Sequence, residues 1–171
     1  LLSVMSGYDG NDPLSLSDPQ SDFSPVPRRS LKGARVAWWK GLGGIPVQKE
    51  IAGKIDSCRA IFEALGCTVE EAEPDFTNVD RSFLTLRHLA LLASIGPLHR
   101  IPPGFLKATI RWELERAAEL KPQDISDAMV HMSSCYAKAA SFFKRYDFFI
   151  LPVTQVVPFD VNTPYPTSIE G

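Results

Sequence analysis

The sequence is poor in cysteine, in net charge and in long apolar stretches. Its three cysteines, Cys58, Cys67 and Cys135, show no CxxC spacing, so neither a zinc site nor a redox motif is indicated, and a reducing compartment fits best. A formal net charge of -2 gives no reason to expect a nucleic acid or a membrane as partner. No apolar stretch approaches the roughly 20 residues that span a bilayer. The composition, with 44% hydrophobic residues, is that of a globular protein, for which we expect a cytoplasmic location.

The usual patterns of catalytic and metal-binding residues are also missing. No HExxH or comparable spacing relates the three histidines, which are His88, His99 and His131. No serine lies in a G-x-S-x-G turn, and the pair Ser133 and Ser134 falls inside a predicted helix, where hydroxyls usually bond to the backbone. Glu70 and Glu71 are adjacent in a predicted strand, so their side chains should point to opposite faces. The residues therefore indicate no catalytic site, no metal and no cofactor.

Residues 31–73 carry the pattern of a strand, a helix and a second strand. Residues 34–39 form a short β-rich run with little alternation, which is typical of a strand covered on both faces. A glycine-rich turn follows, and Pro46 is well placed to begin a helix whose apolar residues recur every three or four positions until Gly66. Residues 67–72 then predict a second strand. The default for such a unit is a right-handed parallel crossover.

The glycine-rich turn resembles a nucleotide-binding loop only in part. The dinucleotide fingerprint needs G-x-G-x-x-G, and here Gly41 and Gly43 supply the first two glycines while Pro46 occupies the third position. Proline cannot give the close contact between helix and strand for which the third glycine serves. The acid that such sites place on the ribose would have to be one of Glu70, Glu71 and Glu73. We interpret the turn as an ordinary strand-to-helix loop, with a nucleotide site as the weaker alternative.

Residues 80–146 have the pattern of three helices. The first ends at Gly96-Pro97, the second follows a corner at Pro102, and the third and longest begins after Lys121-Pro122. The apolar face predicted for the first helix consists of Phe83, Leu86, Leu89, Ala90 and Ala93. The apolar face predicted for the third consists of Ile125, Met129, Met132, Tyr136, Ala139 and Phe143.

The two ends of the chain have a different character. Leu1–Met5 predict the last turn of a helix that Gly7 stops, and residues 8–30 form a polar surface connection. Residues 147–171 predict a buried strand, closed by Pro152, and an extended tail. Because a helix of five residues is too short to be worth forming, we expect its beginning to lie upstream, in a longer protein.

Four segments, taken together and in order, resemble the amidase signature family. Residues 1–15 are similar to a helix end followed by an M-x-G and D-P loop, and residues 31–37 to the family's LKG-x-R strand. Residues 62–69 are similar to its ALGxxV passage from helix to strand, and residues 146–154 to a strand that begins with Y-D and closes with proline. Each motif alone is weak, but their order and spacing also agree with the family, so the resemblance extends over essentially the whole chain.

The resemblance implies hydrolysis of a carboxylic amide to an acid and ammonia or an amine, acting on a small-molecule substrate without a metal or cofactor. In that family a serine attacks the carbonyl, and a cis-serine and a lysine relay the proton. The stretches that carry these three residues precede the matched region. We therefore expect residues 1–171 to be an incomplete, C-terminal part of a single amidase-signature domain, with no catalytic residue and no activity alone. The implied fold is a partial α/β fold with a mixed sheet, a right-handed βαβ unit and a helical segment between strands.

The substrate-binding residues that we predict are Pro152 and Thr154, because open α/β sheets bind ligands beyond the carboxyl ends of their strands. Phe83, Arg87 and His88 are further candidates for the wall of the cleft, although helix packing explains them equally well. Two alternatives stay open: the A subunit of glutamyl-tRNA amidotransferase, and an α/β binding module that is not an enzyme. A homo-oligomer also stays open, and we expect a large apolar surface on this part of the domain.

Overall fold

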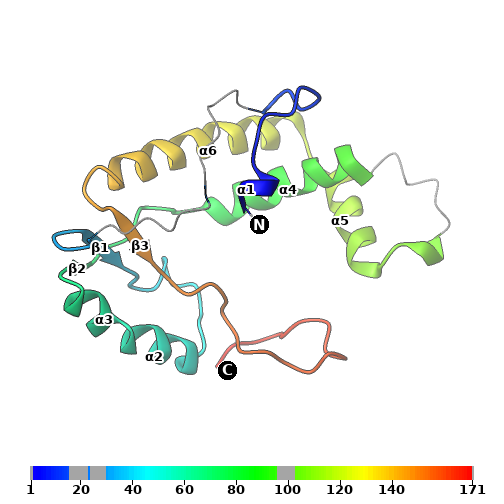
Figure 1. Cartoon of the computed structure of the whole chain (residues 1–171). Coiled ribbons are helices and arrows are strands. Elements are labelled where there is room, and N and C mark those ends of the chain that lie inside the picture. The colour runs from blue at the N-terminus through cyan, green and yellow to red at the C-terminus, as the bar shows by residue number, and fades with distance from the viewer. Residues whose placement is uncertain (1, 16–22, 24–29, 96–102, 171) are drawn as a thin grey trace. The chain divides into compact units, whose positions relative to one another are not determined.

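The computed structural model describes residues 2–15, 23, 30–95 and 103–170 (Figure 1). The chain divides into two compact units, Leu1–Leu31 and Lys32–Gly171. Within the described residues, no helix combines the length and the apolar character that crossing a membrane requires.

The first unit begins with the short helix α1 (Leu2–Met5). The chain leaves the helix at Gly7, whose φ of 148° lies in a region that favours glycine, and this confirms the predicted helix end. Asp9 then accepts the backbone N–H of Asn11 at 2.9 Å, which is a local turn typical of a surface connection.

The second unit is built on a three-stranded sheet in the order β2-β1-β3 (Figure 1). The central strand β1 (Arg35–Trp38) pairs with β2 (Thr68–Glu71) on one side and with β3 (Phe148–Ile150) on the other, and both pairs are parallel. The α/β class and the parallel crossover are thus confirmed. A mixed sheet was expected, but the strands that the structure describes are all parallel. Each partner strand follows a helical connection, which is the usual link between parallel neighbours.

The core of the sheet is the central strand. Val36 and Ala37 are fully buried and Trp38 is 2% exposed, as predicted for a strand that is covered on both faces. The Trp38 ring meets the edge of Phe62 at 5.9 Å between ring centroids, and its indole N–H donates to Asp56 at 3.1 Å. The helices of the crossover therefore cover one face of β1 through this tryptophan.

The crossover helix is interrupted, where a single helix was expected. It consists of α2 (Lys49–Ser57) and α3 (Arg59–Ala64), because the side chains of Ser57 and Cys58 both donate to the carbonyl of Lys54 and compete with the regular backbone pattern. The helix also begins at Lys49 rather than at Pro46. The preceding Gln48 is extended, with ψ 138°, and its N–H donates to Gln155 O at 2.9 Å.

The helical region consists of α4 (Val79–Ile95), the 3-10 turn η2 (Pro103–Phe105), α5 (Ala108–Ala118) and α6 (Pro122–Phe142). Helix α4 packs against both α5 and α6 (Figure 1). The three predicted helices are thus confirmed. The predicted break at Gly96-Pro97, the corner at Pro102 and His99 lie outside the described residues.

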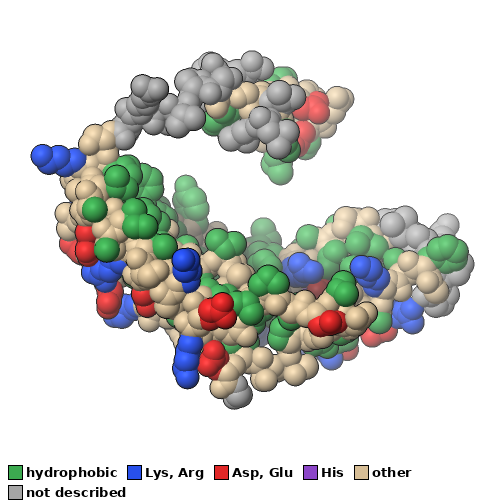
Figure 2. All heavy atoms as spheres, turned by 60° about the horizontal axis from the view of Figure 1, so that its bottom comes forward, with side chains coloured by type: hydrophobic (Ala, Val, Ile, Leu, Met, Phe, Trp, Pro, Cys, Tyr) green, Lys and Arg blue, Asp and Glu red, His purple; other side chains and the backbone are tan. Residues whose placement is uncertain are grey.

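The predicted apolar faces of these helices are wrong as predictions of the core. The buried residues of α4 are polar, namely Ser82, Thr85 and His88, and those of α6 are small, namely Ala128 and Cys135. Phe83 is 57% exposed, Met129 60% and Tyr136 77%. Small and polar side chains let α4 and α6 approach closely, so their large apolar side chains lie elsewhere. Figure 2 shows hydrophobic side chains at the surface on the face that it draws, and the expected large apolar patch stays a prediction.

Candidate functional site

The carboxyl ends of the three strands lie at one edge of the sheet. The pairing continues one residue past the strands, since Trp39 N–H donates to Ile150 O and Ala72 N–H to Trp38 O, both at 3.0 Å. Three loops begin at this edge, residues 39–48 after β1, residues 72–78 after β2 and residues 151–157 after β3. Ligand sites of parallel sheets form from such loops.

Two of these loops line an apolar cavity of about 380 Å³ that is open to solvent. The lining residues are Leu42, Ile45, Val47, Pro152, Val153, Thr154 and Gln155. Both predicted substrate-binding residues, Pro152 and Thr154, are among them, and their role in binding stays a prediction. The cavity has the size and the mainly aliphatic lining of a site for a small apolar group.

Hydrogen bonds made by two glutamines, Gln48 and Gln155, join the loops to each other. Gln48 donates its N–H to Gln155 O at 2.9 Å, and its side-chain carbonyl accepts the N–H of Val157 at 2.7 Å. The amide of Gln155 returns to Pro46 O at 2.8 Å. Sequence reasoning missed both glutamines, because a glutamine in a loop carries no signal until the facing loop is known.

Thr154 is exposed at the cavity, and its hydroxyl is already oriented. Its Oγ1 donates to Val156 O at 3.1 Å. With the proton directed to the backbone, the oxygen lone pairs are left to accept an N–H group. The neighbouring Val153 is fully exposed. This edge of the cavity thus offers one hydrogen-bond acceptor beside an aliphatic surface.

The glycine-rich turn after β1 is held by Glu73. One carboxylate oxygen, Oε1, accepts the N–H groups of Lys40 at 2.6 Å and of Leu42 at 2.7 Å. These amides would have to be free to hold a phosphate, so their use by Glu73 argues against the nucleotide site considered from the sequence.

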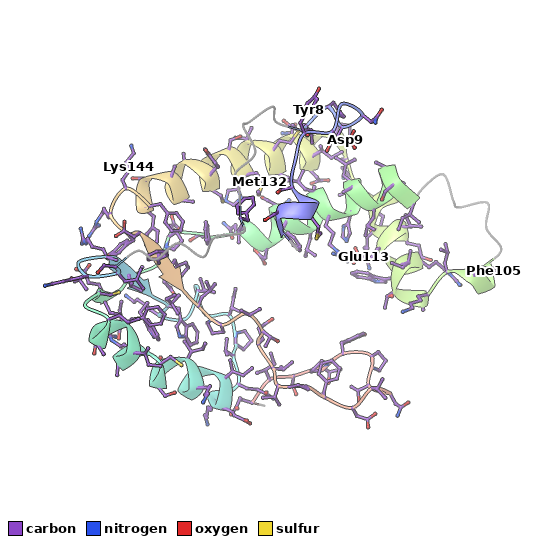
Figure 3. All side chains as sticks on the ribbon, in the orientation of Figure 1. Tyr8, Asp9, Phe105, Glu113, Met132 and Lys144 are labelled. Atoms are coloured by element: carbon purple, nitrogen blue, oxygen red, sulfur yellow. The ribbon has the colours of Figure 1, made fainter. Side chains whose placement is uncertain are left out.

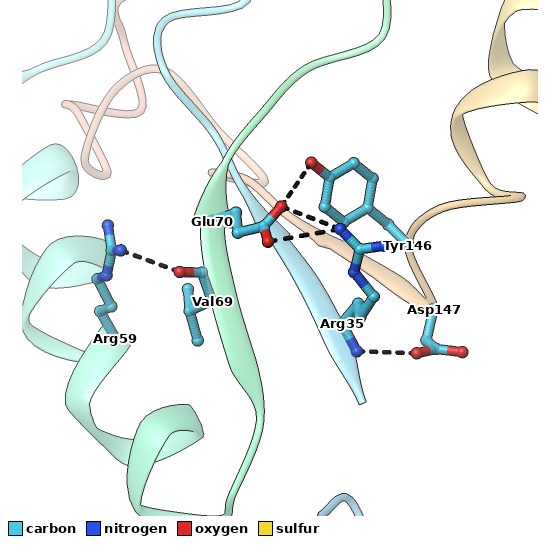
Figure 4. A network of polar contacts seen from close by, with 6 residues as sticks. All are labelled: Arg35, Arg59, Val69, Glu70, Tyr146 and Asp147. Atoms are coloured by element: carbon cyan, nitrogen blue, oxygen red, sulfur yellow. Dashed lines mark hydrogen bonds and ion pairs between the residues drawn. The ribbon is translucent and has the colours of Figure 1, made fainter. Parts of the chain in front are cut away.

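A charged network joins the other ends of the strands (Figure 4). Glu70 accepts from Tyr146 Oη at 3.0 Å and from Arg35 Nη2 at 3.2 Å, while Asp147 accepts the N–H of Arg35 at 2.8 Å. The Tyr146 hydroxyl, together with Arg35, lowers the pKa of Glu70, and burial together with Glu70 raises the pKa of Tyr146. Glu71 pairs instead with Arg59 at 3.6 Å, so the two glutamates do point to opposite faces. The network orders the strands, and its charged groups are engaged with one another.

His88 and His131 lie at contacts between helices. Glu113 belongs to α5 (Figure 3). Its Oε1 lies 3.1 Å from Arg87 Nε of α4, and its Oε2 lies 3.0 Å from His88 Nε2 of α4, although Oε2 and Nε2 are not aligned as a hydrogen bond. Arg87 and His88 thus hold α5, and Phe83 is exposed and does not line the strand-end cavity. His131 Nδ1 lies 2.8 Å from Ser82 Oγ, between α6 and α4. The described residues contain no group of side chains that could hold a metal ion.

The comparison with known families decides what the chain is. A family model described as Amidase matches residues 1–170. The chain belongs to the amidase family. Among solved structures, this amidase chain is similar to a bacterial aryl acylamidase of the amidase signature enzymes, with a TM-score of 0.76 and 21% identity, over 96% of this chain and 36% of that one. It is also similar to 6-aminohexanoate cyclic dimer hydrolase, with a TM-score of 0.69 and 18% identity, over 91% and 35% of the two chains.

The curated relatives of the amidase chain are longer proteins. It is 25% identical over 186 residues to the acylamidase of Rhodococcus erythropolis, covering 100% of this chain and 36% of that protein. It is 28% identical over 153 residues to a putative amidase of Synechocystis sp., covering 90% and 29%. The A subunit of a glutamyl-tRNA(Gln) amidotransferase from Microcystis aeruginosa is 34% identical over 71 residues, which is 42% of this chain and 15% of that protein. The amidase chain therefore spans roughly a third of the length of the first two relatives.

Proposed function

We propose that this chain is part of an enzyme that hydrolyses carboxylic amides, and that the strand-end cavity binds the apolar group of the amide. The observation that carries the proposal is the aliphatic lining of the cavity beside Thr154, at the edge of the sheet where α/β proteins bind ligands. The aliphatic wall would take an acyl chain or an aryl ring, and Thr154 would accept the amide N–H. Membership of the amidase family and the acylamidase relatives support the reaction.

The nucleophile and its base are proposed to lie outside these residues. The contact between Ser82 and His131 lies between two helices, away from the strand-end loops. The Ser57 hydroxyl donates to the backbone carbonyl of Lys54, which is no base for a nucleophile. We therefore propose that residues 1–171 alone do not turn over an amide. Release of nitroaniline from para-nitroacetanilide by the purified chain would refute this.

The cavity is tested in the amidase polypeptide that contains these residues, with para-nitroanilides of increasing acyl length as substrates. Val153→Asp places a carboxylate on the aliphatic wall, and we expect KM to rise about tenfold or more. Val161→Asp is the matched control, because Val161 is 94% exposed in the tail and does not line the cavity. Equal KM values for the two variants would contradict the proposed site. Thr154→Ala should raise KM by a smaller factor, about five to ten for one hydrogen bond.

A second candidate is the A subunit of glutamyl-tRNA amidotransferase, which the identity over 71 residues favours. That enzyme would have to accept glutamine, whose ammonium and carboxylate groups need charged partners. The cavity lining contains no charged residue among those that the structure describes, so we favour an apolar amide. Hydrolysis of glutamine in preference to the nitroanilides would reverse this choice.

A further inference from the structure

The wall of the strand-end cavity contains a residue in an unusual backbone conformation. Leu42 has φ +46°, in the left-handed region that residues with a Cβ rarely occupy. It stands between Gly41 and Gly43, which have φ +127° and +69°. A leucine keeps such a conformation only where its surroundings impose it, so something must hold this turn in place.

The carboxylate of Glu73 is what holds it. Positive φ angles turn successive N–H groups to the same side, and such a concavity binds an anion. Here the anion is part of the protein, since Oε1 of Glu73 accepts the N–H of Lys40 at 2.6 Å and that of Leu42 at 2.7 Å. Both distances are short, as expected when the acceptor is charged. A single oxygen therefore fixes the residues on both sides of Gly41.

The other wall of the cavity has its own fastening. The bonds of Gln48 and Gln155 join residues 155–157 to residues 46–48 and do not involve Glu73. Loss of Glu73 would therefore release the wall at Leu42 and leave the facing wall, with Pro152 and Thr154, in place. Because different residues hold the two walls, a substitution of Glu73 should alter the wall at Leu42 alone.

We propose that Glu73 is a positioning residue that holds Leu42 in the cavity wall and so sets the length of the apolar group that the enzyme accepts. The inference rests on the proposed function of the cavity. It differs from that proposal because Glu73 itself does not line the cavity and acts only through the backbone of the turn.

The test compares Glu73→Ala, Glu73→Gln and Leu42→Gly in the amidase polypeptide that contains these residues, with para-nitroanilides from acetyl to octanoyl. In Glu73→Ala we expect the dependence of kcat/KM on acyl length to flatten, with a loss of about tenfold at the preferred length. The acetanilide, which has the shortest acyl group of the series, should keep its kcat within about twofold. Glu73→Gln retains a carbonyl acceptor and should restore most of the length preference. Glu115→Ala, which removes an exposed carboxylate of α5, is the control and should leave the profile unchanged.

Leu42→Gly keeps the inference testable if Glu73→Ala fails to fold. Glycine tolerates the left-handed conformation and removes the side chain, so it should flatten the length profile without disturbing the turn. An unchanged profile in both Glu73→Ala and Leu42→Gly, with a wild type that does discriminate by length, would overturn the inference alone. A wild type that turns over none of the anilides would instead overturn the proposed function on which it rests.

Discussion

The sheet and the helical region of the second unit are held together in different ways. Around the sheet, the buried side chains are apolar, with Val36 and Ala37 inaccessible and Trp38 at the centre. Between α4 and α6 they are polar or small, and Ser82 there meets the ring of His131. The packing around the sheet is stabilised by burial of apolar surface, which has little dependence on direction. The packing between α4 and α6 depends on hydrogen bonds of defined length and direction. One unit thus contains a contact that tolerates small shifts and a contact that does not.

The largest difference between the two regions is expected from substitution of Trp38 and of Trp112, two of the three tryptophans. Trp38→Ala should lower the free energy of unfolding by about 3–5 kcal/mol, because it leaves a cavity in the core and removes the partner of Phe62 and Asp56. Trp112→Ala should cost about 1 kcal/mol or less, since Trp112 is 51% exposed and contacts the ring of His88 and the guanidinium of Arg116 at the surface. Urea unfolding followed by circular dichroism measures both. Similar losses in the two variants would remove the contrast.

A hydroxyl deletion tests the polar contact between α4 and α6. Ser82→Ala removes the partner of His131 Nδ1 and leaves that partly buried ring edge without its hydroxyl, which should cost about 1 kcal/mol in urea unfolding. Ser94→Ala is the matched control, because the Ser94 hydroxyl is exposed and donates to carbonyls of its own helix. A loss no larger than that of the control would show that packing of small side chains alone joins the helices.

The smallest effect is expected from the ion pair that links the two regions. Asp75 follows β2 and lies 2.7 Å from Lys138 on α6, and the bonds from Lys138 and Thr77 hold the pKa of Asp75 well below its usual range. Because folding lowers this pKa, the stability it contributes is complete above the unfolded value of about 4 and is lost as the pH falls through the folded value.

Asp75→Asn should therefore unfold at a lower urea concentration than the wild type at neutral pH. In acid, the unfolding midpoints of the two proteins should become equal. Asp80→Asn, at an exposed position of α4, controls for the loss of one charge. High salt should reduce the effect, since both partners are partly exposed. A difference between Asp75→Asn and wild type that stays constant from neutral pH down to strong acid would contradict the assignment.

The two regions also differ in what their sequence predicts. Strand β1 could be identified because every residue from Val36 to Trp38 is apolar. Both faces of the strand are buried, so no single buried face had to be chosen from the sequence. In α4 and α6 the apolar residues were recognised, yet the face that packs could not be chosen without knowing that Ser82 meets His131. The spacing of apolar residues predicts that a helix has two faces. Which face is buried depends on the helix that packs against it.

In the candidate site, too, some residues could be placed from the sequence and others could not. Pro152 and Thr154 could be placed beyond a strand end because the strand itself was recognised, and both line the cavity. Glu73 was considered only as a ribose acid, since its contact with the turn depends on the parallel pairing of β1 with β2. Residues whose position follows from one segment could be placed from the sequence, and residues whose contacts join two loops could not.

The position of β3 has a consequence for how the chain acquires its structure. Arg35 and Asp147, which meet where β1 pairs with β3, are 112 residues apart in sequence. During translation at about 5–20 residues per second, β1 therefore keeps one open edge for on the order of ten seconds before its partner is made. Closing so long a loop is slow, and an unpaired apolar strand invites association with other chains in the meantime. The yield of soluble protein should thus depend on how fast β3 is synthesised and on chaperones that cover the open edge of β1 in the meantime.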